Sequence, residues 1–237
     1  HAGLQDIVAR LRHFAEHLLP SRSRGVGVAD PARRLSLANF EECLHRSFPP
    51  CMRQLVFSQR TGRHLKHLGR LQLRPFLREA GMSLQEALVW WSTELCRDPS
   101  VAPRDFDQTY RYDVEHAWGT RGHMRGSFCF SCGKIASFGP GYSGQVHGCP
   151  LEQMSPDELA REFRVLGLRR EDIARIVGHT LHGRARTACA QFFASTHPGV
   201  DPAALPSAIY HPSAFFRLSR QHLVGAHQGA RNHDMGS

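Results

Sequence analysis

The segment between Trp118 and Pro150 limits the possible folds of this chain more than any other feature of its sequence. It is rich in glycine, lacks apolar periodicity and holds three of the seven cysteines. A loop of this length is uncommon in a compact domain unless something organises it. Metal ligation by its cysteines would do so, and the sequence therefore indicates a metal-bound loop inside an otherwise regular fold.

Around this loop, the sequence predicts a mostly α-helical protein. Ser83 and Ser155 each begin a capping box, with Glu86 and Glu158 three residues later, a pattern typical of helix N-termini. Residues 20–32 are rich in proline, glycine and serine and indicate a linker. The expected helices cover approximately residues 4–18, 37–44, 50–81 with a break at Gly62, 84–91, 103–117, 156–166, 170–195 and 212–223.

Length and apolar content allow a buried core, in one large domain or two small ones. We expect residues 1–35 to form an N-terminal helix and linker, 36–225 the domain, and 226–237 a disordered tail. The formal charge of +9 favours an anionic partner. No apolar run approaches the roughly 18 residues that a membrane span needs, so no membrane role is expected. Seven cysteines without a secretory signal do not suit a disulfide framework.

The cysteines nearest in sequence indicate a zinc site. Cys129 and Cys132 form one short ligand pair, and His147 and Cys149 form a second pair after the intervening loop. Two such pairs can hold tetrahedral zinc, although the second pair is more tightly spaced than usual. Cys43 and Cys96, in contrast, suit buried single thiols.

A basic stretch lies between Glu42 and Glu79, where no acidic residue occurs. Such runs are commonly a solvated helix face. Lys66 and Arg70 would share one face of a helix, and Gly69 would let the backbone approach a phosphate closely. The basic residues of the stretch are Arg46, Arg53, Arg60, Arg63, Lys66, Arg70, Arg74 and Arg78.

No catalytic site is indicated by the sequence. Asp105 and Asp107 are the nearest candidates for metal-dependent phosphoryl transfer, but residues two apart do not share a helix face. They suit the start of a helix, where negative charge is favourable. Neither a phosphate-binding glycine loop nor a nucleophile elbow is present.

An ordered set of motifs resembles the C-terminal iron–sulfur domain of the eukaryotic-type DNA primase large subunit. The similarity runs from about residue 36 to about residue 220. The motifs are Ser47-Phe48-Pro49-Pro50-Cys51-Met52-Arg53-Gln54-Leu55, His64-Leu65-Lys66-His67-x-Gly69-Arg70, Leu84-Gln85-Glu86-Ala87-Leu88-x-x-Trp91, Phe106-Asp107-x-x-Tyr110-x-Tyr112, Phe130-Ser131-Cys132-x-Lys134-Ile135, His147-Gly148-Cys149-Pro150 and Ala188-Cys189.

The resemblance implies a [4Fe–4S] cluster that joins two helical halves. Its ligands would be Cys51, Cys132, Cys149 and Cys189, leaving Cys129 as a spare thiol and His147 as a neighbour. Cluster assembly would then be coupled to folding. The alternatives are a zinc-stabilised interaction module using Cys129, Cys132, His147 and Cys149, and a redox enzyme, which would need a second cofactor or partner.

The resemblance also implies a non-catalytic role in primer synthesis, because the polymerising carboxylates of the family belong to its small subunit. The domain would bind the DNA template and the 5′-triphosphate end of the RNA primer. The implied partners are the primase small subunit and DNA polymerase alpha, through parts of the chain outside this sequence, and the implied location is the nucleus. Leu68-Gly69 replaces the double glycine common in the family. The contact residues carried over are His64, Lys66, His67, Arg70 and Tyr112.

Overall fold

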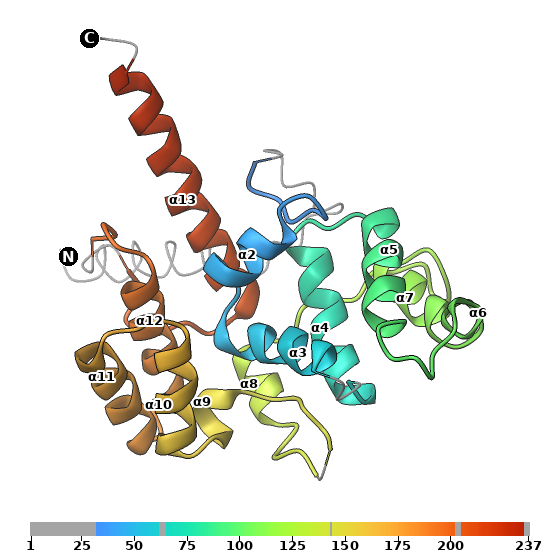
Figure 1. The fold of residues 1–237 in the computed structure, drawn as a ribbon, viewed down its shortest axis with the longest axis horizontal. Helices are drawn as coiled ribbons and strands as arrows, with labels where there is room; N and C mark the ends of the chain where they lie inside the picture. Colours follow the sequence, from blue (N-terminus) through green and yellow to red (C-terminus); the bar gives the residue numbers. More distant parts are fainter. Residues whose placement is uncertain (1–31, 62–64, 143, 202–204, 235–237) are drawn as a thin grey trace, which may run out of the picture.

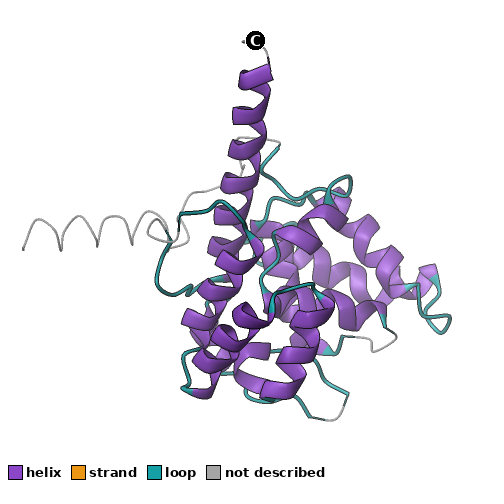
Figure 2. Ribbon diagram, turned by 60° about the vertical axis from the view of Figure 1, so that its left-hand side comes forward, coloured by secondary structure: helices purple, strands orange, loops and turns teal. Residues whose placement is uncertain are grey.

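The computed structural model describes residues 32–61, 65–142, 144–201 and 205–234, and this part of the chain is mostly helical. Figure 2 shows helices and connecting loops without a strand in that part. The elements are α2 (Phe40–Arg46), α3 (Pro50–Arg60), α4 (His67–Glu79), α5 (Leu84–Leu95), α6 (Pro103–Asp105), the π-helix η1 (Phe106–Tyr110), α7 (Arg111–Trp118), α8 (Cys132–Ala136), α9 (Pro150–Gln153), α10 (Pro156–Val165), α11 (Arg170–Leu181), α12 (Ala185–Thr196) and α13 (Pro212–Asp234).

Two hydrophobic cores divide the molecule into two halves. The first core is built from α2 to α7 and includes Phe48, Phe76 and Trp91. The second core is built mainly from α9 to α12, and Figure 1 shows α10, α11 and α12 together on the side away from α5 and α7. The start of α13 joins the halves, because Phe215 is buried in the second core and Phe216 in the first.

Both predicted capping boxes are confirmed. Ser83 Oγ accepts a hydrogen bond from the Glu86 backbone N–H, and the Glu86 carboxylate accepts from the Ser83 N–H at 2.9 Å. Ser155 and Glu158 form the same reciprocal pair at α10. These bonds satisfy backbone donors that have no partner inside the helix.

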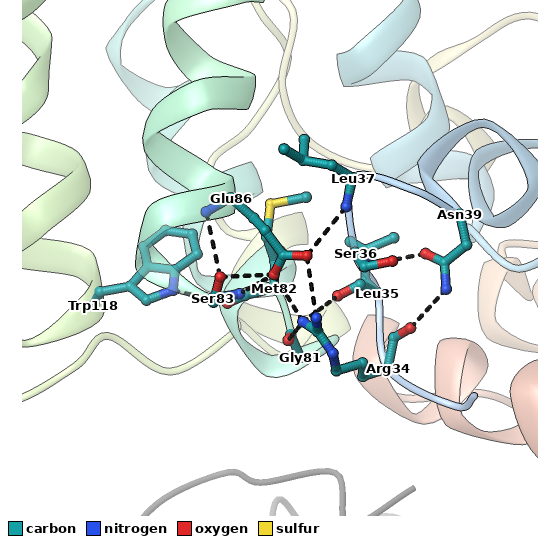
Figure 3. Close-up of polar contacts among 10 residues, drawn as sticks. All are labelled: Arg34, Leu35, Ser36, Leu37, Asn39, Gly81, Met82, Ser83, Glu86 and Trp118. Atoms are coloured by element: carbon teal, nitrogen blue, oxygen red, sulfur yellow. Dashed lines mark hydrogen bonds and ion pairs between the residues drawn. The ribbon is translucent and has the colours of Figure 1, made fainter. Parts of the chain in front are cut away.

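The Ser83 capping box also anchors the segment before α2 (Figure 3). The Arg34 guanidinium donates to the Glu86 carboxylate at 2.7 Å, and the Leu37 N–H donates to the same carboxylate. The Trp118 indole donates to the Met82 carbonyl at 2.9 Å. One helix start therefore holds three separate parts of the first half together.

Two expected helices differ from those observed. The helix expected over 170–195 is wrong as a single element, because α11 ends at Leu181 and α12 begins at Ala185. Gly183 lies between them with a φ of 67°, in the left-handed region that ends helices. Helix α13 continues to Asp234, beyond the expected end at residue 223 and into the segment expected to be a disordered tail.

The remaining expectations about organisation are partly outside the described residues. The helix expected over 4–18 and its linker fall within residues 1–31, which lie outside them. The described residues between Trp118 and Pro150 are largely irregular, as expected, and contain the short helix α8. Among the described helices, none combines the length and apolarity needed to cross a membrane.

Candidate metal centre and nucleic-acid interface

Four cysteines from distant parts of the chain line one cavity between the two halves. Cys51 lies in the first turn of α3, Cys132 begins α8, Cys149 directly precedes α9, and Cys189 lies within α12. All four are free thiols. Cys51 belongs to the first core, Cys189 packs against the second, and Cys149 packs against both. The cavity therefore sits where a bound group would join the halves.

The surroundings of the four thiols are mainly apolar, with one basic and one acidic side chain. Arg186 and Glu152 also line the cavity: the charge of Arg186 opposes the rise in the pKa values of Cys132 and Cys149, and the charge of Glu152 adds to it. A basic side chain in this position would offset part of the negative charge of four thiolates. The apolar lining includes Pro49, Ile135, Leu151, Ala185, Ile209 and Pro212.

Burial makes these thiols poor acids without a cation. Desolvation raises the pKa of Cys132 to about 12 and that of Cys149 to about 11. Burial, with the neighbouring cysteines as a second cause, raises the pKa of Cys51 and of Cys189 well above the usual thiol value. A bound metal reverses this preference, because a coordinated thiol loses its proton. Four thiols lining one cavity are the donor set of a [4Fe–4S] cluster or of tetrahedral zinc.

The zinc site expected from local spacing is not assembled at this cavity. Cys132 and Cys149 line it, but Cys129 and His147 do not. His147 is buried, with its ring packed edge-on against Phe138. Cys129 is also buried, in a group with Glu79 and His211 that sequence reasoning missed. Glu79 and His211 lie 50 and 82 positions from Cys129 along the chain, so no sequence signal joined the three.

The basic stretch is not a continuous solvated face. Arg53 and Arg74 are buried, and Arg74 pairs with Asp113 at 2.9 Å. Arg60 pairs with Glu41 at 2.6 Å and with Glu94 at 2.8 Å. Arg60 and Arg74 are therefore paired with carboxylates from outside the stretch, whereas Arg53 donates to the Leu44 and His45 carbonyls.

The predicted nucleic-acid contacts gather at the start of α4. Lys66 is its N-cap residue and His67 its first residue, and both are exposed. Arg70 is half-buried, donates to the Leu65 carbonyl, and places its guanidinium 5.2 Å from the centre of the Tyr110 ring. A helix N-terminus carries free N–H groups and partial positive charge, which favour anions. His64 lies outside the described residues.

Tyr112 offers an exposed aromatic surface two residues from Tyr110, whose ring contacts Arg70. Its side chain is 55% exposed and stacks on His116, with ring centres 6.1 Å apart. Tyr110 is only partly buried in the first core, and its ring covers Arg70. The structure therefore gives these two tyrosines different surroundings, and Tyr112 is the one available to stack on a base.

The candidate phosphoryl-transfer carboxylates have structural partners. Asp105 accepts a hydrogen bond from the Ala102 N–H at 2.8 Å at the start of α6. Asp107 pairs with Arg111 one turn along the chain at 2.9 Å. Both positions match the expectation that these residues begin a helix.

Taken with the fold, these sites define a mostly helical protein built in two halves around a cavity of four cysteine thiols. The chain belongs to the family formed by the C-terminal domain of the eukaryotic and archaeal DNA primase large subunit, whose model matches residues 41–216. The resemblance deduced from the motifs is thereby confirmed.

Curated relatives agree with this family. Over 192 residues the chain is 33% identical to the DNA primase large subunit of Mus musculus, covering 81% of this chain and 37% of that protein. The corresponding protein of Homo sapiens is 32% identical over the same share of each chain. The protein of Saccharomyces cerevisiae is 29% identical over 185 residues, which cover 77% of this chain and 35% of that protein. The chain thus spans little more than a third of the length of these relatives.

Proposed function

We propose that this chain is the part of a DNA primase that binds the template and the 5′-triphosphate end of the RNA primer during DNA replication. The observation that carries the proposal is the basic group of Lys66, His67 and Arg70 at the N-terminus of α4. A triphosphate would receive charge-assisted hydrogen bonds from these side chains and from the free N–H groups of the helix. His64, next to this group in the sequence, is part of the proposed site.

The contacts of Arg70 indicate that its side chain is preorganised for binding. Its guanidinium is held between the Leu65 carbonyl and the Tyr110 ring. A side chain held in this way loses less conformational entropy on binding than a free one. Tyr112 would add stacking on a base or sugar, which depends little on base identity. Binding would therefore select the end of the primer rather than a sequence.

A [4Fe–4S] cluster is proposed as the group that links the two helical halves of the domain. Cys51, Cys132, Cys149 and Cys189 would hold it, and they fit because all four thiols line one mainly apolar cavity. When bound, the cluster would supply a cross-link between the halves and could exchange an electron. The residues of this chain would do the binding, while the separate polymerising subunit extends the primer.

The wider partners follow from the family and are part of the same proposal. The small subunit would supply polymerisation, and it and DNA polymerase alpha would attach through parts of the protein outside this sequence. The proposed location is the nucleus, where replication takes place.

The test of the end-binding site compares two nucleic acids. Binding of anaerobically purified protein is measured by fluorescence anisotropy on an RNA–DNA junction with a 5′-triphosphate and on a blunt duplex. Lys66→Ala and Arg70→Ala should each weaken junction binding about tenfold or more, as expected for lost charge-assisted hydrogen bonds, and affect the duplex far less.

Arg46→Ala is the matched control, because Arg46 is an exposed cation of the same basic stretch. It should change both affinities only slightly. Equal losses on junction and duplex for Lys66→Ala, Arg70→Ala and Arg46→Ala would mean that the stretch attracts nucleic acid by net charge alone, and the end-binding proposal would be abandoned.

A further inference from the structure

Helix α4 contacts the cysteine-bearing loop through a fully buried amide. The Gln72 side chain has no exposed surface. Its Nε2 donates to the Gly148 carbonyl at 3.0 Å, and its Oε1 accepts from the Gly148 N–H at 2.7 Å. Both backbone polar groups of the residue before Cys149 are therefore bound by one side chain.

The backbone at position 148 favours glycine. Its φ of 88° lies in the left-handed region, where other side chains are strained, and a Cβ atom here would also displace the end of the Gln153 side chain. A second close approach lies two residues earlier, where the Val146 carbonyl oxygen would be 2.5 Å from a Cβ at Gly69 of α4. The backbone before Cys149 is thus held against α4 at two points.

The other end of α4 makes a comparable contact with the first part of the loop. Glu79 is the last residue of α4 and is 5% exposed. Its Oε1 accepts from the Cys129 N–H at 2.8 Å, and its Oε2 accepts from Ser213 Oγ at 2.8 Å. The carboxylate therefore joins α4 to the Cys129 segment and to the start of α13.

His211 completes this arrangement. Its Nε2 lies 3.1 Å from the Cys129 carbonyl oxygen, and its Nδ1 accepts from the Ser213 N–H at 3.3 Å. A carbonyl can only accept, so Nε2 carries the proton and Nδ1 is the acceptor, in agreement with both contacts. Although Glu79, Cys129 and His211 lie close enough to hold a metal ion, the carboxylate oxygens and ring nitrogens already have partners.

The same two segments form the wall of the four-cysteine cavity around Cys132. The Cys132 N–H donates to the Tyr210 carbonyl at 2.9 Å. Ile209 and Pro212, on either side of Tyr210 and His211, line the cavity. Anything that fixes Cys129 and residues 211–213 therefore fixes the backbone from which Cys132 projects.

We propose that α4 positions the two middle cysteines, Cys132 and Cys149, through the buried polar side chains of Glu79 and Gln72. These residues are seven positions apart, two helical turns, so they share one face of α4. Gln72 binds the residue directly before Cys149, and Glu79 binds Cys129, three residues before Cys132. Removing groups that orient metal ligands weakens metal binding. The inference rests on the proposed cluster, since it concerns how two of its ligands are held.

The experiment measures how fast the metal leaves the anaerobically purified chain. Iron release to a chelator is followed by the visible absorption band, with iron content, helicity and thermal midpoint measured on the same samples. Glu79→Leu and Gln72→Leu remove the hydrogen bonds and should release iron about tenfold faster than the unaltered protein. Glu79→Gln can still accept from the Cys129 N–H and should release iron at nearly the original rate.

Glu94→Leu is the matched control for general instability. Glu94 is a buried carboxylate of the same half, paired with Arg60 and Arg97 and absent from the cavity wall. Its loss should lower the thermal midpoint with less effect on release. If Glu94→Leu and Glu79→Leu have similar thermal midpoints and release iron equally fast, the proposed positioning by α4 is wrong. Iron release would then depend on the stability of the fold alone.

Two other outcomes separate this inference from the proposed function. One zinc ion per chain that is lost in Glu79→Gln would make the Glu79 group a metal site and overturn the positioning role. Zinc in the four-cysteine cavity of the unaltered protein would overturn the cluster proposal. The rate of zinc release from the same variants would then still test whether α4 positions Cys132 and Cys149. A chain that binds no metal would overturn both the cluster proposal and the positioning inference.

Discussion

His197 Nε2 and Ser219 Oγ lie 2.7 Å apart and join the end of α12 to α13 by a buried hydrogen bond. Ser219 Oγ also lies 2.8 Å from Ser47 Oγ, within hydrogen-bond distance, so the contact reaches from the second half to the first. Burial lowers the pKa of His197 to about 4. The neutral ring is therefore the form that the folded protein holds.

Stability should fall as the pH drops below about 6.5. The folded pKa of His197 is lower than its unfolded value, so the unfolded chain takes up the proton first. The contribution is fully present above about pH 6.5 and is lost progressively as the pH falls toward about 4, by up to about 3 kcal/mol. Chemical denaturation at several pH values checks this, with His197→Gln giving a flatter profile and the exposed His123→Gln leaving it unchanged. Identical profiles for all three proteins would contradict the assignment.

Arg74 and Asp113 should respond unequally to substitution. Burial lowers the pKa of Arg74 to about 10 although Asp113 opposes the shift, so the guanidinium stays charged at neutral pH. Asp113→Asn leaves this buried charge without its carboxylate and should cost about 1–2 kcal/mol. Arg74→Met keeps packing near Trp91 and should cost less, because apolar replacements of buried ion pairs are often nearly neutral. Denaturation midpoints measure the stability of both variants. A larger loss of stability for Arg74→Met than for Asp113→Asn would contradict this expectation.

Glu86 should stabilise the fold only when it is ionised. Its burial would raise the pKa, but hydrogen bonds from Arg34 and Ser83 outweigh this and lower the pKa to about 2. The stabilisation is therefore present above about pH 4.5 and lost as the pH falls toward about 2. Glu86→Gln should cost about 1–2 kcal/mol at pH 7, with the difference from the unaltered protein shrinking in acid. Denaturation at several pH values measures it.

The second capping box is the control for Glu86. Glu158 makes the same bonds to Ser155 but is exposed and has no arginine hydrogen bond comparable to that of Arg34. Glu158→Gln should therefore cost less than Glu86→Gln. Equal losses would show that the cap alone, and not the Arg34 contact, accounts for the effect.

Removal of individual cysteines should separate the cluster from the zinc alternative. Cys51→Ala should abolish the visible band and most bound iron, because Cys51 lines the cavity and a four-thiolate cluster would lose a ligand. Cys129→Ala should keep the metal, since the contact with Glu79 uses its backbone N–H. Cys96→Ala is the control for thiol loss away from the cavity. Metal loss in Cys129→Ala with tolerance of Cys51→Ala would favour zinc instead.

The local structure was predictable where single segments contain their own signals. The Ser83 and Ser155 capping boxes placed two helix starts, and glycine enrichment placed the irregular loop. The break at Gly183 was missed because an interior glycine does not reveal its backbone angle, whereas the structure has it at a positive φ. The cavity-lining set of cysteines came from the family resemblance, since spacing alone favoured the local zinc pairs.

The sequence by itself determined that the chain is mostly helical, which helices begin at capping boxes, and which family it belongs to. Only the tertiary structure decided which charges are free and what holds the loop. Arg60 and Arg74 are neutralised by Glu94 and Asp113, which lie 34 and 39 residues away, and Glu79 meets Ser213 across 134 residues. Helix caps act within one turn, but ion pairs and buried hydrogen bonds depend on distances that only the packed chain creates.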